Sequence, residues 1–302
     1  MATRGIGQPD DSPVSKSAML ISTACAVVSK DSIYAKTFHD PYAVRFATAI
    51  SPEAGPVLAG LDDADARAAF IAEWEADMDG LITHVLYRKP WIENAVREAL
   101  AAGMRQLVIF GAGCDTLSLR LAESLGDIPV FEVDQRDVIA FRNSVLADGA
   151  GVPAGVHRVG IDFSRETVRD RLAEAGYASA LPTVFVAEGV MEYLTPEEVE
   201  PIFALVRDRA PKGSRFVFTF LARSVYADGS FDTLREQLDK GGETLQFGLT
   251  PEQLDDFLAA HGMRRLAFET PDMLDERMRR SVGAPVGIIP GFHFVAVETV
   301  QA

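Results

Sequence analysis

The chain reads Arg105-Gln-Leu-Val-Ile-Phe110, followed directly by Gly111-Ala-Gly-Cys-Asp-Thr116. This stretch is the strongest indication of the fold. A short apolar run ended by glycine is typical of a strand buried on both faces of a sheet. Glycine lets a ligand approach the backbone closely, and open parallel sheets bind ligands at the carboxyl ends of their strands. The stretch therefore predicts a first strand followed by a ligand-binding loop, although its two glycines alone do not choose the ligand.

Further strands and helices alternate on the carboxyl side of this loop. Apolar runs predict strands over 129–133, 156–161, 183–187 and 215–220, and helices over 116–125, 138–146, 166–175 and 196–209. Such alternation predicts a Rossmann-like α/β fold, with a mostly parallel sheet and helices on both faces. Two later runs, 263–269 and 292–299, complete a seven-stranded sheet with a terminal hairpin.

The chain divides into two predicted sections. Residues 1–103 show helical periodicity, for example from Ala69 through Trp74 and Met78 to Val85, and predict an N-terminal helical cap. Residues 104–302 form the core. A glycine-rich stretch at about 222–248 predicts an insertion after the fifth strand that covers a site.

Composition excludes several classes of partner. The 302 residues carry 44 acidic and 29 basic side chains, a net charge of −15, which repels nucleic acid and anionic membranes. Cys25 and Cys114 have no metal-ligand spacing, so no metal site is predicted. The apolar run 18–28 is too short to span a bilayer and follows no basic leader, which indicates a buried helix and a cytoplasmic protein.

Asp115 favours one type of ligand over another. It stands where a dinucleotide fold would receive pyrophosphate, and a carboxylate repels that anion. S-adenosylmethionine has no phosphate and carries an ammonium and a sulfonium. The loop therefore favours the methyl donor over a nicotinamide cofactor.

Acidic residues follow the second, third and fourth strands. Asp134 comes 21 residues after Gly113, about the spacing at which such folds place an acid on ribose hydroxyls, so it is the first choice for the ribose diol, with capping of the next helix as the alternative. Asp162 is a candidate for the adenine amino group with Phe163 beside the base, or a solvated loop acid. Glu188 would stand at the mouth of the sheet, where the donor's amino group would offset its buried charge.

These residues together resemble the leucine carboxyl methyltransferase family, including bacterial members that methylate polyketide or peptide carboxylates. The resemblance rests on the 105–121 stretch, Glu132-Val-Asp134, Glu188-Gly189 with Tyr193-Leu194, and Pro211-Lys-Gly-Ser214. It extends over most of the chain, from Asp40-Pro-Tyr-Ala43 to Phe247-Gly-Leu-Thr-Pro-Glu252. It implies a class I methyltransferase fold that binds S-adenosyl-L-methionine and releases S-adenosyl-L-homocysteine.

The resemblance also implies a set of donor-binding residues. Arg88 matches the family's arginine that clamps the donor carboxylate, while Lys16 and Lys30 are candidates for its N-terminal lysine contacts. Where relatives read Gly-Ala-Gly-Leu-Asp-Thr-Arg, this chain has Cys114 and Leu117, which weakens any inference of a shared acceptor. The predicted donor site comprises Arg88, Gly111, Ala112, Gly113, Asp134, Asp162, Phe163 and Glu188.

The predicted activity is O-methyl transfer, with a carboxylate of a small molecule or peptide natural product as the expected acceptor. A carboxylate is ionised at neutral pH and needs no general base, and none of the five histidines directly follows a core strand, so each is expected to be surface or structural. Acceptor-side candidates are Glu192, Tyr193, Arg223 and Tyr226, although Tyr193 could be a packed aromatic. Methylation of a phenol or alcohol is the main alternative; a nicotinamide oxidoreductase and a non-catalytic donor-binding protein are the others.

Overall fold

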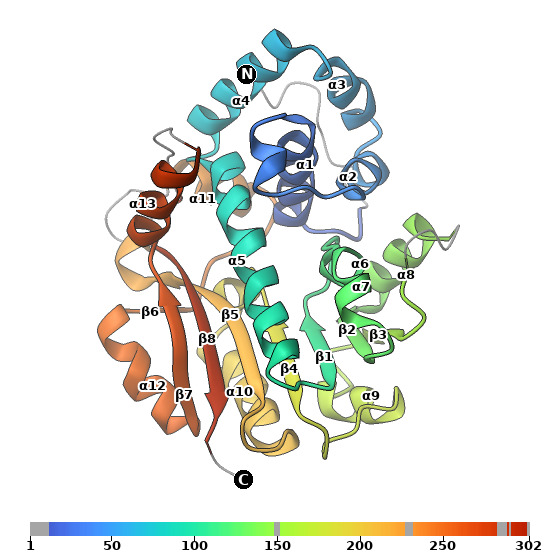
Figure 1. The fold of residues 1–302 in the computed structure, drawn as a ribbon, viewed down its shortest axis with the longest axis vertical. Helices are drawn as coiled ribbons and strands as arrows, with labels where there is room; N and C mark the ends of the chain where they lie inside the picture. Colours follow the sequence, from blue (N-terminus) through green and yellow to red (C-terminus); the bar gives the residue numbers. More distant parts are fainter. Residues whose placement is uncertain (1–11, 148–151, 227–231, 283–288, 290, 301–302) are drawn as a thin grey trace.

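The computed structural model describes residues 12–147, 152–226, 232–282, 289 and 291–300. Its strands form one sheet in the order β3-β2-β1-β4-β5-β8-β7, with β6 paired to β5 (Figure 1). Strands β1 to β5 run parallel to one another, and β8 runs antiparallel between β5 and β7. The strands are β1 Gln106–Phe110, β2 Val130–Gln135, β3 Val156–Ile161, β4 Thr183–Ala187, β5 Arg215–Ala222, β6 Gly248–Leu249, β7 Met263–Glu269 and β8 Phe292–Thr299.

The predicted α/β fold is confirmed, and each predicted strand is present within two residues of its expected bounds. One prediction about connections is wrong. β7 and β8 are antiparallel neighbours, but the chain between them passes through α13, Pro271–Val282, so they do not form a hairpin with a short turn. The polar sequence of α13 gave no apolar periodicity strong enough to predict it. β6 was also missed because two residues are too short to show a pattern.

Helices of the core follow the predicted alternation, with differences at their ends. The predicted helix 116–125 is broken at Leu121 into two single turns, α6 Leu117–Arg120 and α7 Ala122–Leu125. Thr195 caps α10 through a complete capping box with Glu198, as the sequence Thr-Pro-Glu-Glu predicts. The remaining helices are α8 Arg136–Val145, α9 Val168–Glu174, α10 Pro196–Arg209, α11 Asp232–Lys240 and α12 Leu254–Ala260, with 3₁₀ turns η2 Met191–Tyr193, η3 Arg223–Tyr226 and η4 Pro251–Gln253.

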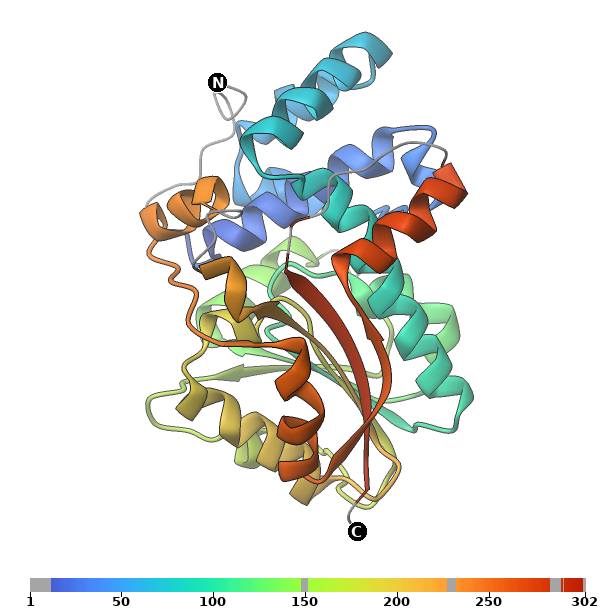
Figure 2. The ribbon, with the colours of Figure 1, turned by 90° about the vertical axis from the view of Figure 1, so that its left-hand side faces the viewer.

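The sheet is covered on both faces because its strands alternate apolar side chains between two cores. In β1, Leu107 and Ile109 point into the core shared with the N-terminal helices, whereas Val108 and Phe110 point into the core beneath α9, α10 and α12. Figure 2 shows α10 and α12 on one side of the sheet and α5 on the other. This double burial explains the near-continuous apolar strands.

The N-terminal helices lie above the carboxyl ends of the parallel strands (Figure 1). Every residue of α1 from Ser22 to Val28 is buried, as expected of a buried helix. No helix among the described residues is long and apolar enough to cross a membrane. Helix α5 packs against β4, β5 and β8 as well as α1 and α4, so it joins both predicted sections. The elements are α1 Lys16–Lys30, η1 Tyr34–Lys36, α2 Ala43–Ile50, α3 Ala54–Gly60, α4 Ala64–Asp77 and α5 Leu81–Ala101.

The apolar series expected from Ala69 to Val85 does not form one helix. Asp79 and Gly80 have φ values of 50° and 87°, which end α4 and start α5 in a new direction. Trp74 is buried but Ala69 is exposed, so the first residues of the series do not all lie on one buried face of α4.

Candidate active site

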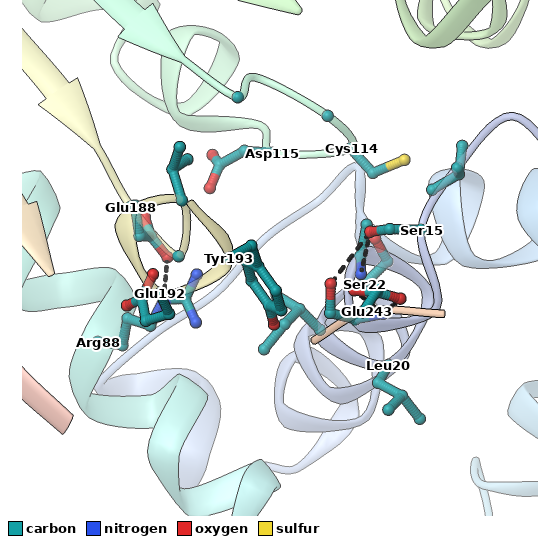
Figure 3. Close-up of a pocket in the computed structure, with 18 of the residues that line it drawn as sticks. Ser15, Leu20, Ser22, Arg88, Cys114, Asp115, Glu188, Glu192, Tyr193 and Glu243 are labelled. Atoms are coloured by element: carbon teal, nitrogen blue, oxygen red, sulfur yellow. Dashed lines mark hydrogen bonds and ion pairs between the residues drawn. The ribbon is translucent and has the colours of Figure 1, made fainter. Parts of the chain in front are cut away.

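A cavity of about 560 Å³ opens at the carboxyl ends of β1, β2 and β4. Its walls come from the first half of α5 and the loop after β1, and it is covered by α1 and by residues 242–246, which we call the strap. Figure 3 shows Arg88, Glu188 and Glu192 grouped at one side, Ser15 and Glu243 at the other, and Tyr193 between them. The sheet thus brings together residues from distant parts of the sequence where parallel folds bind ligands.

The loop after β1 has the shape that its glycines allow. Gly111 has a φ of 60°, and a Cβ atom there would lie 2.5 Å from a methyl carbon of Val190. Gly113 has a φ of 45°, and its N–H donates to Asp134 Oδ2 at 2.6 Å. Any side chain at Gly111 would be strained and would push Val190 out of place.

Asp134 lies at the end of β2 and lines the cavity. Its carboxylate accepts from the N–H groups of Gly113 and Gln135, while α8 has Gln135 at its N-cap and no side-chain cap. Burial raises the pKa of Asp134 in spite of these two hydrogen bonds. Asp134 therefore orders the glycine loop rather than capping the helix.

A buried network of opposite charges forms one wall. Arg88 Nε lies 2.6 Å and Lys89 Nζ lies 2.7 Å from Glu188 Oε1, and Lys89 also contacts Asp115. Burial alone would raise the pKa of Asp115, but Lys89 and Arg120 hold it well below its usual range. Each of these charges is thus compensated inside the protein, as buried ions require.

Sequence reasoning missed Lys89, Arg120 and Asp40, which complete this network. Arg120 lies 3.6 Å from Asp40 and 3.7 Å from Asp115, and Thr116 donates to Asp40 at 2.6 Å. The one available signal was that Lys89 directly follows Arg88 within the mainly apolar stretch Val85 to Ile92. Their pairing with Asp115 and Asp40 depends on tertiary contacts.

Glu192 lies in the cavity wall and is almost fully buried. Among the described residues, its carboxyl group accepts no hydrogen bond from a basic side chain. Its side chain is 1% exposed, Oε1 accepts from Thr219 at 2.9 Å, and Oε2 has no hydrogen-bond partner among the described residues. Burial raises its pKa to about 7, although Arg88 opposes the shift. Glu192 can therefore be present in either protonation state near neutral pH.

His84 also lines the cavity, contrary to the expectation that every histidine is surface or structural. It lies on α5 one turn before Arg88, is 1% exposed, and has no hydrogen-bond partner for either ring nitrogen among the described residues. Burial and the nearby charges of Arg88 and Lys89 hold its pKa well below the usual range, so the ring is neutral. His84 lies within a helix and not directly after a strand, so its place in the sequence does not mark it as a cavity residue.

The model of the leucine carboxyl methyltransferase family matches residues 18–207 of the chain. The chain belongs to the leucine carboxyl methyltransferase family.

Curated relatives of this methyltransferase carry the same activity in their names. A protein of Mycobacteroides abscessus named as an S-adenosyl-L-methionine-dependent methyltransferase is 32% identical over 245 residues, which cover 78% of this chain and 79% of the relative. A Saccharopolyspora erythraea protein with the same name is 35% identical over 65% of this chain and 66% of its own length. The enzyme is an S-adenosylmethionine-dependent methyltransferase.

Solved structures support the fold of the methyltransferase. A DUF574 family protein of Streptomyces avermitilis superposes with a TM-score of 0.58 at 14% identity, covering 96% of this chain and 99% of the other. A methyltransferase of Thermobifida fusca gives a TM-score of 0.52 at 18% identity, covering 86% and 94%. At these identities the likeness concerns the class I methyltransferase fold alone.

The cavity of the methyltransferase suits a phosphate-free, cationic nucleoside. No long helix begins at the glycine loop, since α6 has only four residues, and an ionised Asp115 stands before it. Acidic side chains outnumber basic ones in the lining, which complements a sulfonium and an ammonium. The acidic residues are Asp40, Asp115, Asp134, Glu188, Glu192 and Glu243, and the basic ones Arg88, Lys89 and Arg120.

The structure does not bring every predicted site residue of the methyltransferase into the cavity. Asp162 follows β3 outside the lining, where it accepts from Ser164 and lies 3.7 Å from Arg165, and Phe163 is 59% exposed. Arg223 is exposed outside the lining. The side chain of Tyr226 lies outside the described residues.

Of the predicted lysines, Lys30 lies 2.5 Å from Asp62 outside the cavity lining, and Lys16 packs beside Gly241. The lysine that the structure does place in the wall is Lys89. The predicted residues that line the cavity are Arg88, Gly111, Ala112, Gly113, Asp134, Glu188, Glu192 and Tyr193.

Proposed function

We propose that the enzyme methylates a carboxylate of a small molecule or peptide natural product, forming a methyl ester. The observation that carries the proposal is the match to the leucine carboxyl methyltransferase family over residues 18–207, which include most of the residues that line the cavity. A carboxylate needs no deprotonation before it reacts, so the protein has only to align two reactants and exclude water.

The donor would be held by the charged wall and the glycine loop. Arg88 is the proposed clamp for its carboxylate, Glu188 the partner for its ammonium, and Asp134 the acceptor for its ribose hydroxyls. In this arrangement the contact between Arg88 and Glu188 holds the two side chains close together, as the neighbouring carboxylate and ammonium on one α-carbon require. S-adenosylmethionine supplies, when bound, an electrophilic methyl group for an oxygen nucleophile. Asp162 and Phe163 stay predicted adenine contacts, although both lie outside the cavity lining.

Glu192 gives the acceptor side a group that does not repel a carboxylate when it is protonated. Its Oε2 atom has no partner among the described residues, and its pKa of about 7 allows the neutral acid to donate a hydrogen bond there. Tyr193 lies between Glu192 and Glu243 of the strap. An anionic acceptor can thus bind in a wall that is otherwise rich in acidic groups.

Methylation of a phenol or alcohol is the second candidate, and His84 favours it. A neutral imidazole in the cavity could accept the proton that a hydroxyl must lose. The product distinguishes the two candidates, since methyl esters hydrolyse in mild base and methyl ethers do not.

The test is incubation of the full-length enzyme with methyl-labelled S-adenosylmethionine and separate panels of carboxylic acids, phenols and alcohols. We expect labelled product from acids, with the label released by mild base. Base-stable label formed only from the hydroxyl panel would replace the proposed acceptor by the second candidate.

A further inference from the structure

His84 is a buried polar group with an unsatisfied hydrogen-bonding capacity inside a cavity. Buried polar atoms nearly always have a partner, and an unpaired one costs about 1–3 kcal/mol. Both ring nitrogens of His84 lack a partner among the described residues although the side chain is 1% exposed. Such a group is satisfied when a ligand in the cavity bonds to it.

The ring of His84 packs mainly against apolar side chains, with Arg88 one turn further along α5. The ring packs edge to face against the ring of Phe292, with the two ring centroids 4.5 Å apart. Leu81 lies one turn before His84 on α5. Leu221 of β5 is the partner of Phe292 in β8. His84, Leu81, Leu221 and Phe292 all line the cavity, and we call these four side chains the His84 recess. A ligand group in this recess would contact hydrocarbon and one imidazole.

The recess adjoins one end of the donor site. The guanidinium of Arg88 lies 5.2 Å from the centroid of the Phe292 ring, which His84 also contacts. Arg88 is the proposed clamp for the methionine end of the donor, whereas Asp134 at β2 marks the nucleoside end. The recess therefore lies beside the methionine part of the donor, whose sulfonium sulfur carries the methyl group.

We propose that the His84 recess binds the methyl acceptor, with His84 donating a hydrogen bond to its reacting carboxyl group and the apolar side chains holding a hydrocarbon body. The acceptor is accordingly an apolar acid, aromatic or alkyl, rather than a peptide terminus. A peptide would bring amide groups that Leu81, Leu221 and Phe292 cannot pair. The inference rests on the proposed carboxylate acceptor and specifies its class.

The experiment compares acceptors and variants in one assay. The acceptors are benzoate, phenylacetate and octanoate against short peptides with a free carboxyl terminus. The variants are His84→Phe, which removes both polar atoms, and His84→Asn, which retains an N–H donor. His293→Phe is the matched control, because His293 is also buried without a partner among the described residues but does not line the cavity.

We expect apolar acids to be methylated in preference to peptides. His84→Phe should raise the acceptor KM by about tenfold or more, as expected for loss of a hydrogen bond to a charged group. Titration with S-adenosylhomocysteine should show the donor-product Kd within about twofold of wild type, which also verifies folding. His84→Asn should recover most of the affinity, and His293→Phe should leave KM unchanged.

An unchanged acceptor KM in His84→Phe would overturn the role of His84, and so would an equal rise in His293→Phe. Preference for peptides, or failure of every apolar acid both to react and to bind in calorimetry with S-adenosylhomocysteine present, would overturn the acceptor class. Failure of the proposed function is recognised separately, because it appears as base-stable product from hydroxyl compounds.

Discussion

At the scale of single residues, the site is built from carboxyl groups whose environments differ. Asp115 is held ionised by Lys89 and Arg120, Asp134 is bound to backbone N–H groups, and Glu192 is buried against Thr219. The same side-chain chemistry thus provides a fixed charge, a hydrogen-bond acceptor and a titrating group. Each role follows from the partners that the fold supplies.

Asp134→Ala should weaken donor-product binding by about 1–3 kcal/mol, because it removes a charged hydrogen-bond acceptor from the proposed ribose site. The loss also releases the N–H of Gly113 and loosens the glycine loop. Titration with S-adenosylhomocysteine measures the effect, and Asp127→Ala, at an exposed position before β2, serves as the control. An unchanged Kd in the Asp134 variant would remove this residue from the donor site.

Glu192 should make the protein less stable as the pH rises. Its pKa is about 7 in the fold against an ordinary value of 4.5, so the folded state binds more protons between these values. The free energy of unfolding therefore falls as the pH rises from 4.5 to about 7, by about 3 kcal/mol for a pKa shift of this size. Arg88 lowers the pKa of Glu192 and Glu188 raises it, but burial is the largest cause.

Urea denaturation at pH 5 and pH 8 measures this contribution. Glu192→Gln should flatten the pH dependence because its side chain stays neutral, whereas Glu98→Gln, an exposed substitution on α5, should not. Identical pH dependence in wild type and Glu192→Gln would contradict the raised pKa.

At the scale of elements, the cover of the cavity joins two segments far apart in sequence. Glu243 in the strap accepts from the N–H of Ser17 in the first turn of α1, with its two oxygens 3.0 and 3.3 Å away. A carboxylate at this end of α1 also interacts favourably with the helix dipole. The strap and α1 are thereby held over the cavity.

Glu243→Ala should loosen this cover without altering the charged wall. The lost hydrogen bond is worth about 1 kcal/mol, so the Kd for S-adenosylhomocysteine should rise by about fivefold. Glu236→Ala on α11, an exposed acid outside the cavity lining, is the control and should bind like wild type. Equal affinities in the two variants would show that closure does not depend on Glu243.

At the scale of the whole molecule, a net charge of −15 acts on the two substrates in opposite directions. The averaged field attracts a cationic donor and repels an anionic acceptor. Arg88, Lys89 and Arg120 are each paired with a carboxylate of the cavity wall. Their positive charges therefore do not reverse the negative field at the cavity.

Salt should therefore change the two apparent affinities oppositely. Between roughly 20 and 200 mM salt, screening should lower the KM for a carboxylate acceptor by about twofold and raise that for the donor by a similar factor. Steady-state kinetics with each substrate varied at saturation of the other measures both. Parallel changes in the two constants would contradict a purely electrostatic origin.

Elements with local signals could be predicted from the amino-acid sequence. β1 and β4 are uninterrupted apolar runs, Thr195 to Glu198 marks the start of α10, and Gly111 and Gly113 mark the turn that only glycine adopts readily. These features depend on residues close in sequence, so periodicity and caps reveal them.

Which side chains line the cavity depends on the tertiary structure and could not be predicted from the sequence. Arg88 meets Glu188 across 100 residues, Glu243 meets Ser17 across 226, and His84 enters the cavity from a helix that precedes the sheet. Burial, charge compensation and unsatisfied hydrogen bonds are properties of such contacts and leave no periodic trace in the sequence. For that reason the family and donor could be predicted from the chain, while the acceptor recess emerged only when α5 was packed against β5 and β8.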